Sequence, residues 1–121
     1  MRFLTFIFLT VLLSACTTTP NKLRDSDPVF ESSQRIEAST FANCVVEKWE
    51  NLDYLLYSPV VNIHESSSGY EITQYLDGVL THLADIERAD AGSKVTIYTE
   101  SLSLGDDPAV ISVVSCGDTK S

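Results

Sequence analysis

The residues that could carry acid–base, nucleophilic or metal chemistry are few in this sequence. It has two histidines, His64 and His82, and three cysteines among 121 residues. When the expected strands are aligned through their turns, both histidines fall on one polar sheet face, two strands apart, with Glu71 between them. That separation is roughly 9 to 10 Å, which is too wide for both rings to bind one metal ion. The sequence also has no CxxC, HxxxH, GxSxG, GxGxxG or P-loop pattern, so we predict no metal site, no cofactor and no enzyme activity.

Composition excludes a second class of function. Lys and Arg total 8 against 17 Asp and Glu, a formal net charge of −9. A nucleic-acid partner is therefore not expected, because binding phosphates requires a basic surface. Hydrophobic residues make up 44% of the chain, which is enough for the packed core of one small domain.

The first fifteen residues have the three-part layout of a secretory signal peptide. Arg2 precedes an apolar run of eleven residues, 3–13, and two small residues, Ser14 and Ala15, follow it. As a helix, such a run spans only about 16 Å, roughly half the hydrocarbon thickness of a bilayer. We therefore predict a signal peptide over residues 1–15 and no transmembrane helix there.

The residues Leu13-Ser14-Ala15-Cys16 resemble the signal peptidase II lipobox of bacterial lipoproteins. The resemblance implies cleavage before Cys16, attachment of a diacylglycerol to its thiol, and acylation of the new amino terminus. Two or three acyl chains anchor a protein stably, whereas one chain binds a membrane only marginally. Thr17 stands where many inner-membrane lipoproteins carry Asp, so the resemblance favours the outer membrane and a domain facing the periplasm. The alternative is a plain secretory signal with an incidental cysteine.

The two remaining cysteines, Cys44 and Cys116, form an even pair in an expected oxidising compartment. This pattern predicts a disulfide, with two free buried thiols as the alternative. Removal of residues 1–15 also removes one arginine, so the expected net charge of the mature chain is −10.

The mature chain is expected to consist of a tether, one domain and a short tail. Residues 16–31 hold the lipidated Cys16 and then polar residues and prolines, which indicate a flexible tether with an end-to-end distance of about 20 Å. Residues 32–118 are predicted to form a single α+β domain, and residues 119–121 a tail. An apolar stripe from Ser33 to Leu52 predicts a helix capped by Ser32 or Ser33.

After Pro59 the hydrophobic period changes to two, and turn residues divide the chain into four strands. The loop from Ser66 to Gly69 and the Asp77-Gly78 turn mark two hairpins. The alignment through them places Glu65 opposite Tyr70, Asn62 opposite Thr73, Leu76 opposite Val79 and Thr73 opposite His82. The expected core face is the apolar one: Val61, Ile63, Tyr70, Ile72, Leu76, Val79, Leu83, Val95 and Ile97.

The opposite face is the candidate partner-binding surface, because its tyrosines combine apolar area with hydrogen-bonding tips. Its members are Asn62, His64, Glu71, Thr73, Tyr75, His82, Thr96 and Tyr98. Leu80, Ala84 and Ile86 are expected on the same side, which suggests that a partner, a second copy of the chain or the loop 51–58 covers part of it. An ordinary solvated sheet face is the alternative.

Residues 107–117 fit two kinds of element. Their β-branched content favours a strand, whereas Asp107-Pro108 at the start and Gly117 at the end match helix capping. We favour the helix, because it places Cys116 beside the first helix. The predicted fold is therefore α+β: a four-stranded antiparallel meander packed on one face by an N-terminal helix and a C-terminal helix, or fifth strand, joined by a disulfide.

These features predict a non-enzymatic lipoprotein of the cell envelope that acts as an interaction or accessory module for an envelope protein. The whole layout resembles that of many small envelope lipoproteins, a resemblance that carries no known activity. One alternative is an inhibitor of a basic periplasmic or host enzyme such as lysozyme, since an acidic domain attracts a basic target. A third is a hydrolase that uses the polar sheet face.

Overall fold

The computed structural model describes residues 18–54, 57–100 and 107–117, which form an α+β fold around one antiparallel sheet. The sheet has five strands in the order β1-β5-β4-β3-β2. The strands are β1 (Phe30–Gln34), β2 (Val60–Glu65), β3 (Gly69–Leu76), β4 (Val79–Ala89) and β5 (Gly92–Thr99). The helices are α2 (Pro20–Arg24), α3 (Ala38–Glu50) and α4 (Pro108–Gly117). None of these three helices is long and apolar enough to cross a membrane.

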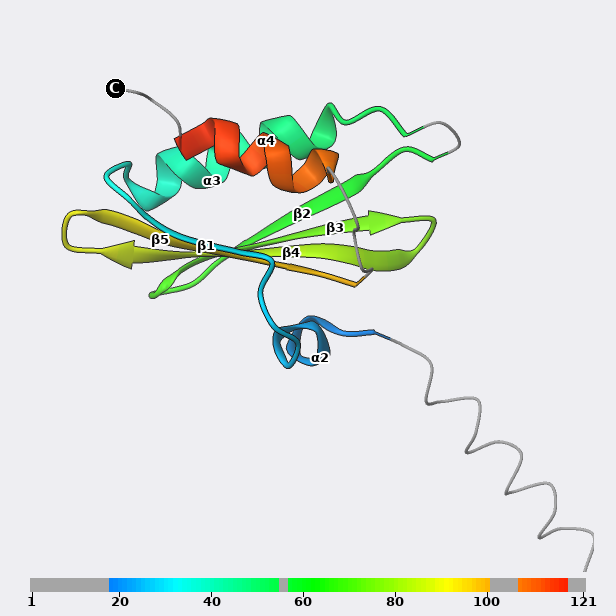
Figure 1. The fold of residues 1–121 in the computed structure, drawn as a ribbon, viewed down its shortest axis with the longest axis horizontal. Coiled ribbons are helices and arrows are strands. Elements are labelled where there is room, and N and C mark those ends of the chain that lie inside the picture. Colours follow the sequence, from blue (N-terminus) through cyan, green and yellow to red (C-terminus); the bar gives the residue numbers. More distant parts are fainter. Residues whose placement is uncertain (1–17, 55–56, 101–106, 118–121) are drawn as a thin grey trace, which may run out of the picture.

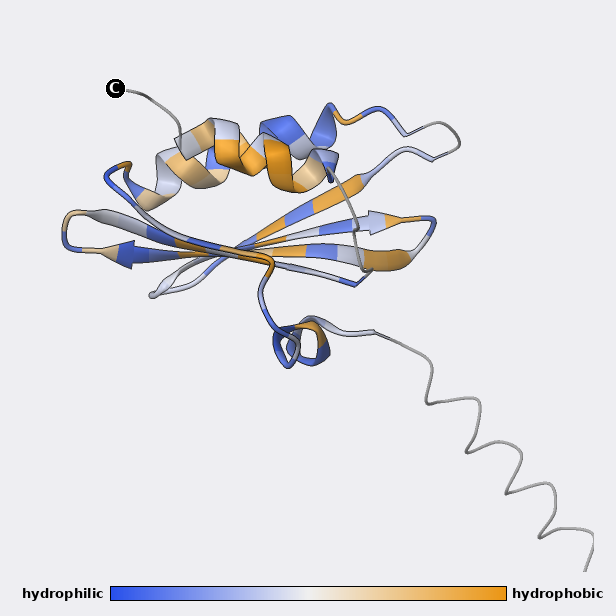
Figure 2. Cartoon of the chain, viewed as in Figure 1, coloured by the Kyte–Doolittle hydropathy of each residue, from blue (hydrophilic) through white to orange (hydrophobic). Residues whose placement is uncertain are grey.

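The sheet separates two layers of helix. Helices α3 and α4 lie side by side over one face, and the short helix α2 lies against the other (Figure 1). We call these the helix face and the outer face. The main core lies between the sheet and the helices α3 and α4, and Figure 2 shows hydrophobic residues on both helices. Its largest members are Phe41, Val45, Trp49, Ile72, Ile86, Val95, Ile97 and Val113.

The predicted meander is present as β2 to β5, but the expected count of four strands is corrected to five. Strand β1 pairs with β5, from Phe30 opposite Ile97 to Gln34 opposite Ser93. It covers an edge of β5 that would otherwise expose unpaired backbone groups. Because β1 takes residues up to Gln34, the first large helix starts at Ala38 and not at Ser33.

The two predicted hairpins and three of the four predicted strand pairings are confirmed. Glu65 lies opposite Tyr70, Asn62 opposite Thr73, and Leu76 opposite Val79. The tight turn between β3 and β4 has positive φ angles at Asp77 and Gly78, +53° and +79°, as expected for Asp-Gly in a two-residue hairpin turn.

The fourth pairing is wrong, because β4 contains a β-bulge. Tyr75 lies opposite Leu80 and Gln74 opposite His82, so Thr81 is an extra residue without a partner on β3. One extra residue turns every later side chain of the strand to the other face. His82, Ala84 and Ile86 therefore point to the helix face, and Leu83 points to the outer face, opposite to the sequence-based assignment.

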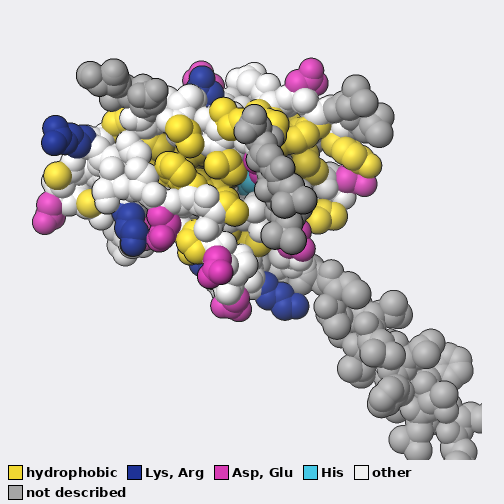
Figure 3. All heavy atoms as spheres, viewed as in Figure 1, with side chains coloured by type: hydrophobic (Ala, Val, Ile, Leu, Met, Phe, Trp, Pro, Cys, Tyr) yellow, Lys and Arg dark blue, Asp and Glu magenta, His cyan; other side chains and the backbone are white. Residues whose placement is uncertain are grey.

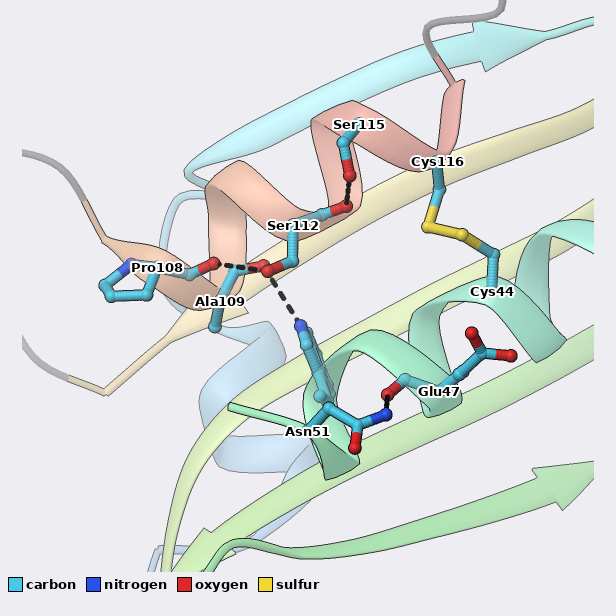
Figure 4. The surroundings of a disulfide bond; sticks show 9 residues. Cys44, Glu47, Asn51, Pro108, Ala109, Ser112, Ser115 and Cys116 are labelled. Atoms are coloured by element: carbon cyan, nitrogen blue, oxygen red, sulfur yellow. Dashed lines mark hydrogen bonds between the residues drawn. A yellow bond between two sulfur atoms is a disulfide. The ribbon is translucent and has the colours of Figure 1, made fainter. Parts of the chain in front are cut away.

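The C-terminal helix and the disulfide are confirmed. Residues 108–117 form α4, and Cys44 of α3 is bonded to Cys116 of α4 (Figure 4). The Trp49 indole N–H donates a hydrogen bond to the Ala109 carbonyl at 3.0 Å, a second link between the two helices.

Part of the expected tether is structured. The side chain of Thr19 accepts a hydrogen bond from the Lys22 N–H, and Pro20 takes the first turn of α2, as is common at helix starts. Leu23 is only 4% exposed. The predicted signal peptide, the lipidation site Cys16 and the tail 119–121 lie outside the described residues.

Candidate functional site

The structure brings seven of the eight residues predicted for the polar face onto the outer face. One row across the strands joins His64, Glu71, Asp85 and Thr96, and the next joins Asn62, Thr73, Leu83 and Tyr98. Tyr75 lies on the same side, opposite Leu80. The exception is His82, which the bulge turns to the helix face.

Helix α2 covers the centre of the outer face. Leu23 packs with Leu80 and Leu83 in a small apolar cluster, and Tyr75 and Tyr98 flank it. Thr73 and Thr96 are each only 5% exposed. Asn62 and His64 on the edge strand β2 are exposed, so this end of the outer face is open to a partner. The cover found here is therefore a segment of the expected tether, whereas the sequence suggested a partner, a second copy of the chain or the loop 51–58.

Arg24 fixes α2 to the sheet through two carboxylates. Its Nε and one terminal nitrogen donate to Asp85 at 2.7 and 2.6 Å, and the same terminal nitrogen donates to Glu71. Glu71 and Asp85 lie directly opposite each other on β3 and β4, where two like charges would repel. Hydrogen bonding to Asp85, more than that to Glu71, raises the pKa of Arg24, so its charge persists at any pH in normal use.

We predict that Arg24→Ala loosens α2 while the rest of the domain stays folded. The loss in unfolding free energy should be about 1 kcal/mol, because the pairs are partly exposed to solvent. Hydrogen exchange of the α2 amides and of Tyr98 should accelerate most. Lys22→Ala is the matched control, because Lys22 lies on the same helix, is exposed and forms no ion pair among the described residues. Equal exchange in both variants would contradict a role for Arg24 in holding α2.

A shallow pocket of about 300 Å³ opens beside Arg24 at the exposed end of the outer face. Its lining is mostly polar and has a net acidic charge, with Glu71, Asp85 and Glu87 against Arg24, beside His64, Ser66 and Tyr70. Within the described ranges no three His, Cys, Asp or Glu side chains are grouped to hold a metal ion. The pocket therefore offers hydrogen bonds and negative charge to a small polar or cationic group.

His82 belongs to a buried network under the start of α4. Its Nε2 lies 2.8 Å from Asp107 Oδ2, its Nδ1 lies 2.9 Å from Gln74 Nε2, and its ring packs 5.9 Å from that of Trp49. Both ring nitrogens are therefore engaged, Nε2 with Asp107 and Nδ1 with Gln74. The sequence-based alignment had no bulge and therefore placed His82 on the outer face. For this reason it did not bring His82 together with Gln74 and Asp107.

The His82–Asp107 pair resembles half of a catalytic triad, but its surroundings favour a structural role. The two side chains are 7% and 12% exposed. The neighbouring Thr81 hydroxyl donates to the Gln74 main-chain carbonyl at 3.1 Å and lies at the same distance from His82 Nδ1. Asp107 also accepts from the Ala109 N–H, which caps α4. The pair therefore links the start of α4 to the sheet.

Helix α4 presents an exposed apolar surface, which was not predicted from the sequence. Ile111 and Val114 are 51% and 45% exposed, and residues 108–117 include no charged side chain. Figure 3 shows hydrophobic side chains grouped on one side of the molecule, with charged side chains around the group. This surface belongs to the helix layer, on the opposite side of the sheet from α2.

Two tyrosines, Tyr54 in the segment before β2 and Tyr98 on β5, have raised pKa values. Burial is the main cause at both Tyr98, where nearby Asp85 adds to it, and Tyr54. A raised pKa in the folded state means that the neutral phenol contributes stability below pH 10 and that this contribution is lost as the pH rises through the folded-state value.

We therefore predict that the domain loses stability above pH 10 and that Tyr98→Phe reduces this loss. Denaturant titrations at pH 8 and at several values above pH 10 measure the effect. Phenolate absorbance should show Tyr98 ionising later in the folded protein than in urea. The same loss of stability in the wild type and in Tyr98→Phe would contradict the prediction.

Comparison of the chain with protein-family models, curated proteins and solved structures finds no match.

Proposed function

We propose that this protein is a lipid-anchored, non-enzymatic module of the bacterial envelope that makes contacts through the open end of its outer face. The observation that carries the proposal is the lipobox-like sequence ending at Cys16, placed directly before a disulfide-bonded domain. The disulfide between Cys44 and Cys116 supports the proposal because disulfides persist in oxidising compartments such as the periplasm.

The arrangement of the site also supports a binding role over a chemical one. The exposed residues Asn62 and His64 lie on the edge strand β2, whose outer backbone groups have no neighbouring strand within residues 18–54, 57–100 and 107–117. A free edge and a shallow polar pocket are features of a contact surface. The His82–Asp107 pair, in contrast, is buried and engaged in holding α4.

The anchor is tested by replacing Cys16. We expect wild-type cells to incorporate labelled palmitate into the protein and to keep it in the outer-membrane fraction, and Cys16→Ser to abolish both. Cys44→Ala with Cys116→Ala is the control, because it removes the other two cysteines and leaves the lipobox intact. A wild-type protein without acyl chains, found by mass spectrometry, would refute the anchor.

The contact surface is tested by photo-cross-linking in intact cells. A photoreactive residue at Asn62 or His64 should cross-link to a component of the envelope, whereas one at Thr40, exposed on α3, should not. Cross-links at Thr40 alone would place the contact on the helix layer and would contradict the proposed surface.

A further inference from the structure

We infer that the partner of the outer face is the lipid headgroup surface of the membrane that carries the anchor, and that α2 holds the domain flat against it. This inference rests on the proposed lipidation of Cys16. It names the chemistry of the contact, a phospholipid surface, and the orientation of the domain.

The first step is the length of chain between the anchor and the folded domain. Thr18 lies only two positions after Cys16, and Thr19 already caps α2. Two residues reach at most about 7 Å when fully extended. The lipid attachment point therefore lies next to α2, and not at the end of the tether of about 20 Å that the sequence alone suggests.

The second step is that α2 is fixed to one face of the sheet. Leu23 is buried against Leu80 and Leu83, and Arg24 binds Asp85 and Glu71. Because α2 lies on the outer face while α3 and α4 lie on the other side (Figure 1), the short link draws the outer face toward the membrane. The helix layer then points away from the bilayer.

The third step is that charge alone does not produce this arrangement. Acidic side chains such as Glu31, Glu71 and Asp85 lie on the outer face, and Lys22 and Arg24 of α2 offset them only in part. An acidic surface is not attracted electrostatically to anionic lipids, and salt screens charge effects at the membrane surface. The orientation should therefore depend on the covalent link and on α2, and not on ionic strength.

The test measures which side of the domain lies next to the bilayer. Because Cys16 is acylated and Cys44 is bonded to Cys116, a cysteine introduced elsewhere is the only free thiol. The full-length lipidated protein, labelled with a fluorophore at His64→Cys or at Thr40→Cys, is reconstituted into phosphatidylethanolamine–phosphatidylglycerol vesicles that contain a headgroup spin-labelled lipid. We expect several-fold stronger quenching at position 64 on the outer face than at position 40 on α3, in low and in high salt.

Two variants separate the contributions of the link and of α2. A flexible Gly/Ser segment of about twelve residues inserted after Thr17 adds about 20 Å of reach without changing the domain, and should equalise the quenching at both positions. Leu23→Ala with Arg24→Ala should do the same by freeing α2, whereas Lys22→Ala should keep the difference.

Each outcome decides the inference. Equal quenching at the two positions of the native chain overturns the orientation while leaving the anchor intact, and a difference that survives the insertion overturns the role of the short link. Photo-cross-links from Asn62 that carry protein and no lipid also overturn it. A protein that is not acylated and does not enter vesicles instead refutes the proposed function itself.

Discussion

Replacing both Cys44 and Cys116 with alanine should lower the free energy of unfolding by about 4 kcal/mol. The bond closes a loop with a sequence separation of 72, and a cross-link over such a length restricts the unfolded chain by about that amount. Small domains have total stabilities of only about 5 to 15 kcal/mol, so the loss is a large part of the whole. Denaturant unfolding followed by circular dichroism measures it.

The effect should be largest at α4. This helix packs mainly on α3, and without the disulfide it keeps its buried residues Ala109 and Val113, the bond from Trp49 and the His82–Asp107 link at its start. Hydrogen exchange should therefore rise more in α4 than in β3 or β4. Cys16→Ser is the control, because it removes a cysteine but no cross-link. Unfolding of the double variant at the wild-type denaturant concentration would contradict the prediction.

The parts of the fold that could be predicted are those that local chemistry determines. Asp77-Gly78 specifies a tight hairpin by itself, since both residues adopt positive φ angles. Asp107 and Pro108 mark the start of α4, and the Asp107 side chain does cap it. The disulfide follows from the number of cysteines that remain once Cys16 is assigned to the lipid.

The errors come from features that only long-range contacts determine. Nothing in Leu80-Thr81-His82 identifies a bulge, yet the extra residue Thr81 reverses the faces of the rest of β4. Helix α2 has five residues, too few for a stable helix alone, and depends on a partner 61 positions away through Arg24 and Asp85. The candidate surface was therefore predicted in most of its residues but not in its cover or in the position of His82.

Strand β1 is another element that depends on long-range contacts and could not be predicted from its own residues. Its residues Phe30 to Gln34 include one large apolar side chain, so no alternating pattern identifies a strand. The strand forms because β5 offers a free edge, and it pairs there from Phe30 opposite Ile97 onward. A pairing that distant in sequence leaves no local signal.

Gly69→Ala should be the most damaging single substitution at the open end of the outer face. Gly69 starts β3 with a φ angle of +155°, and a Cβ there would lie 2.0 Å from the Ile86 carbonyl oxygen on β4. Real Cβ atoms do not approach so closely, and the obstacle is backbone within a ladder of hydrogen bonds. The two strands must separate at this point, which should cost about 3 kcal/mol or more.

Gly78→Ala is the matched control for this substitution. Gly78 also has a positive φ angle, +79°, but a Cβ there meets nothing within 4 Å. Its cost should be only that of the backbone conformation, about 1 to 2 kcal/mol. Denaturant unfolding of the two variants should therefore separate close backbone approach from φ strain. Because Gly69 lines the pocket beside His64, Gly69→Ala should also weaken photo-cross-linking from position 64, whereas Gly78→Ala should not. Equal destabilisation by the two variants would contradict the close approach of β3 and β4 at Gly69.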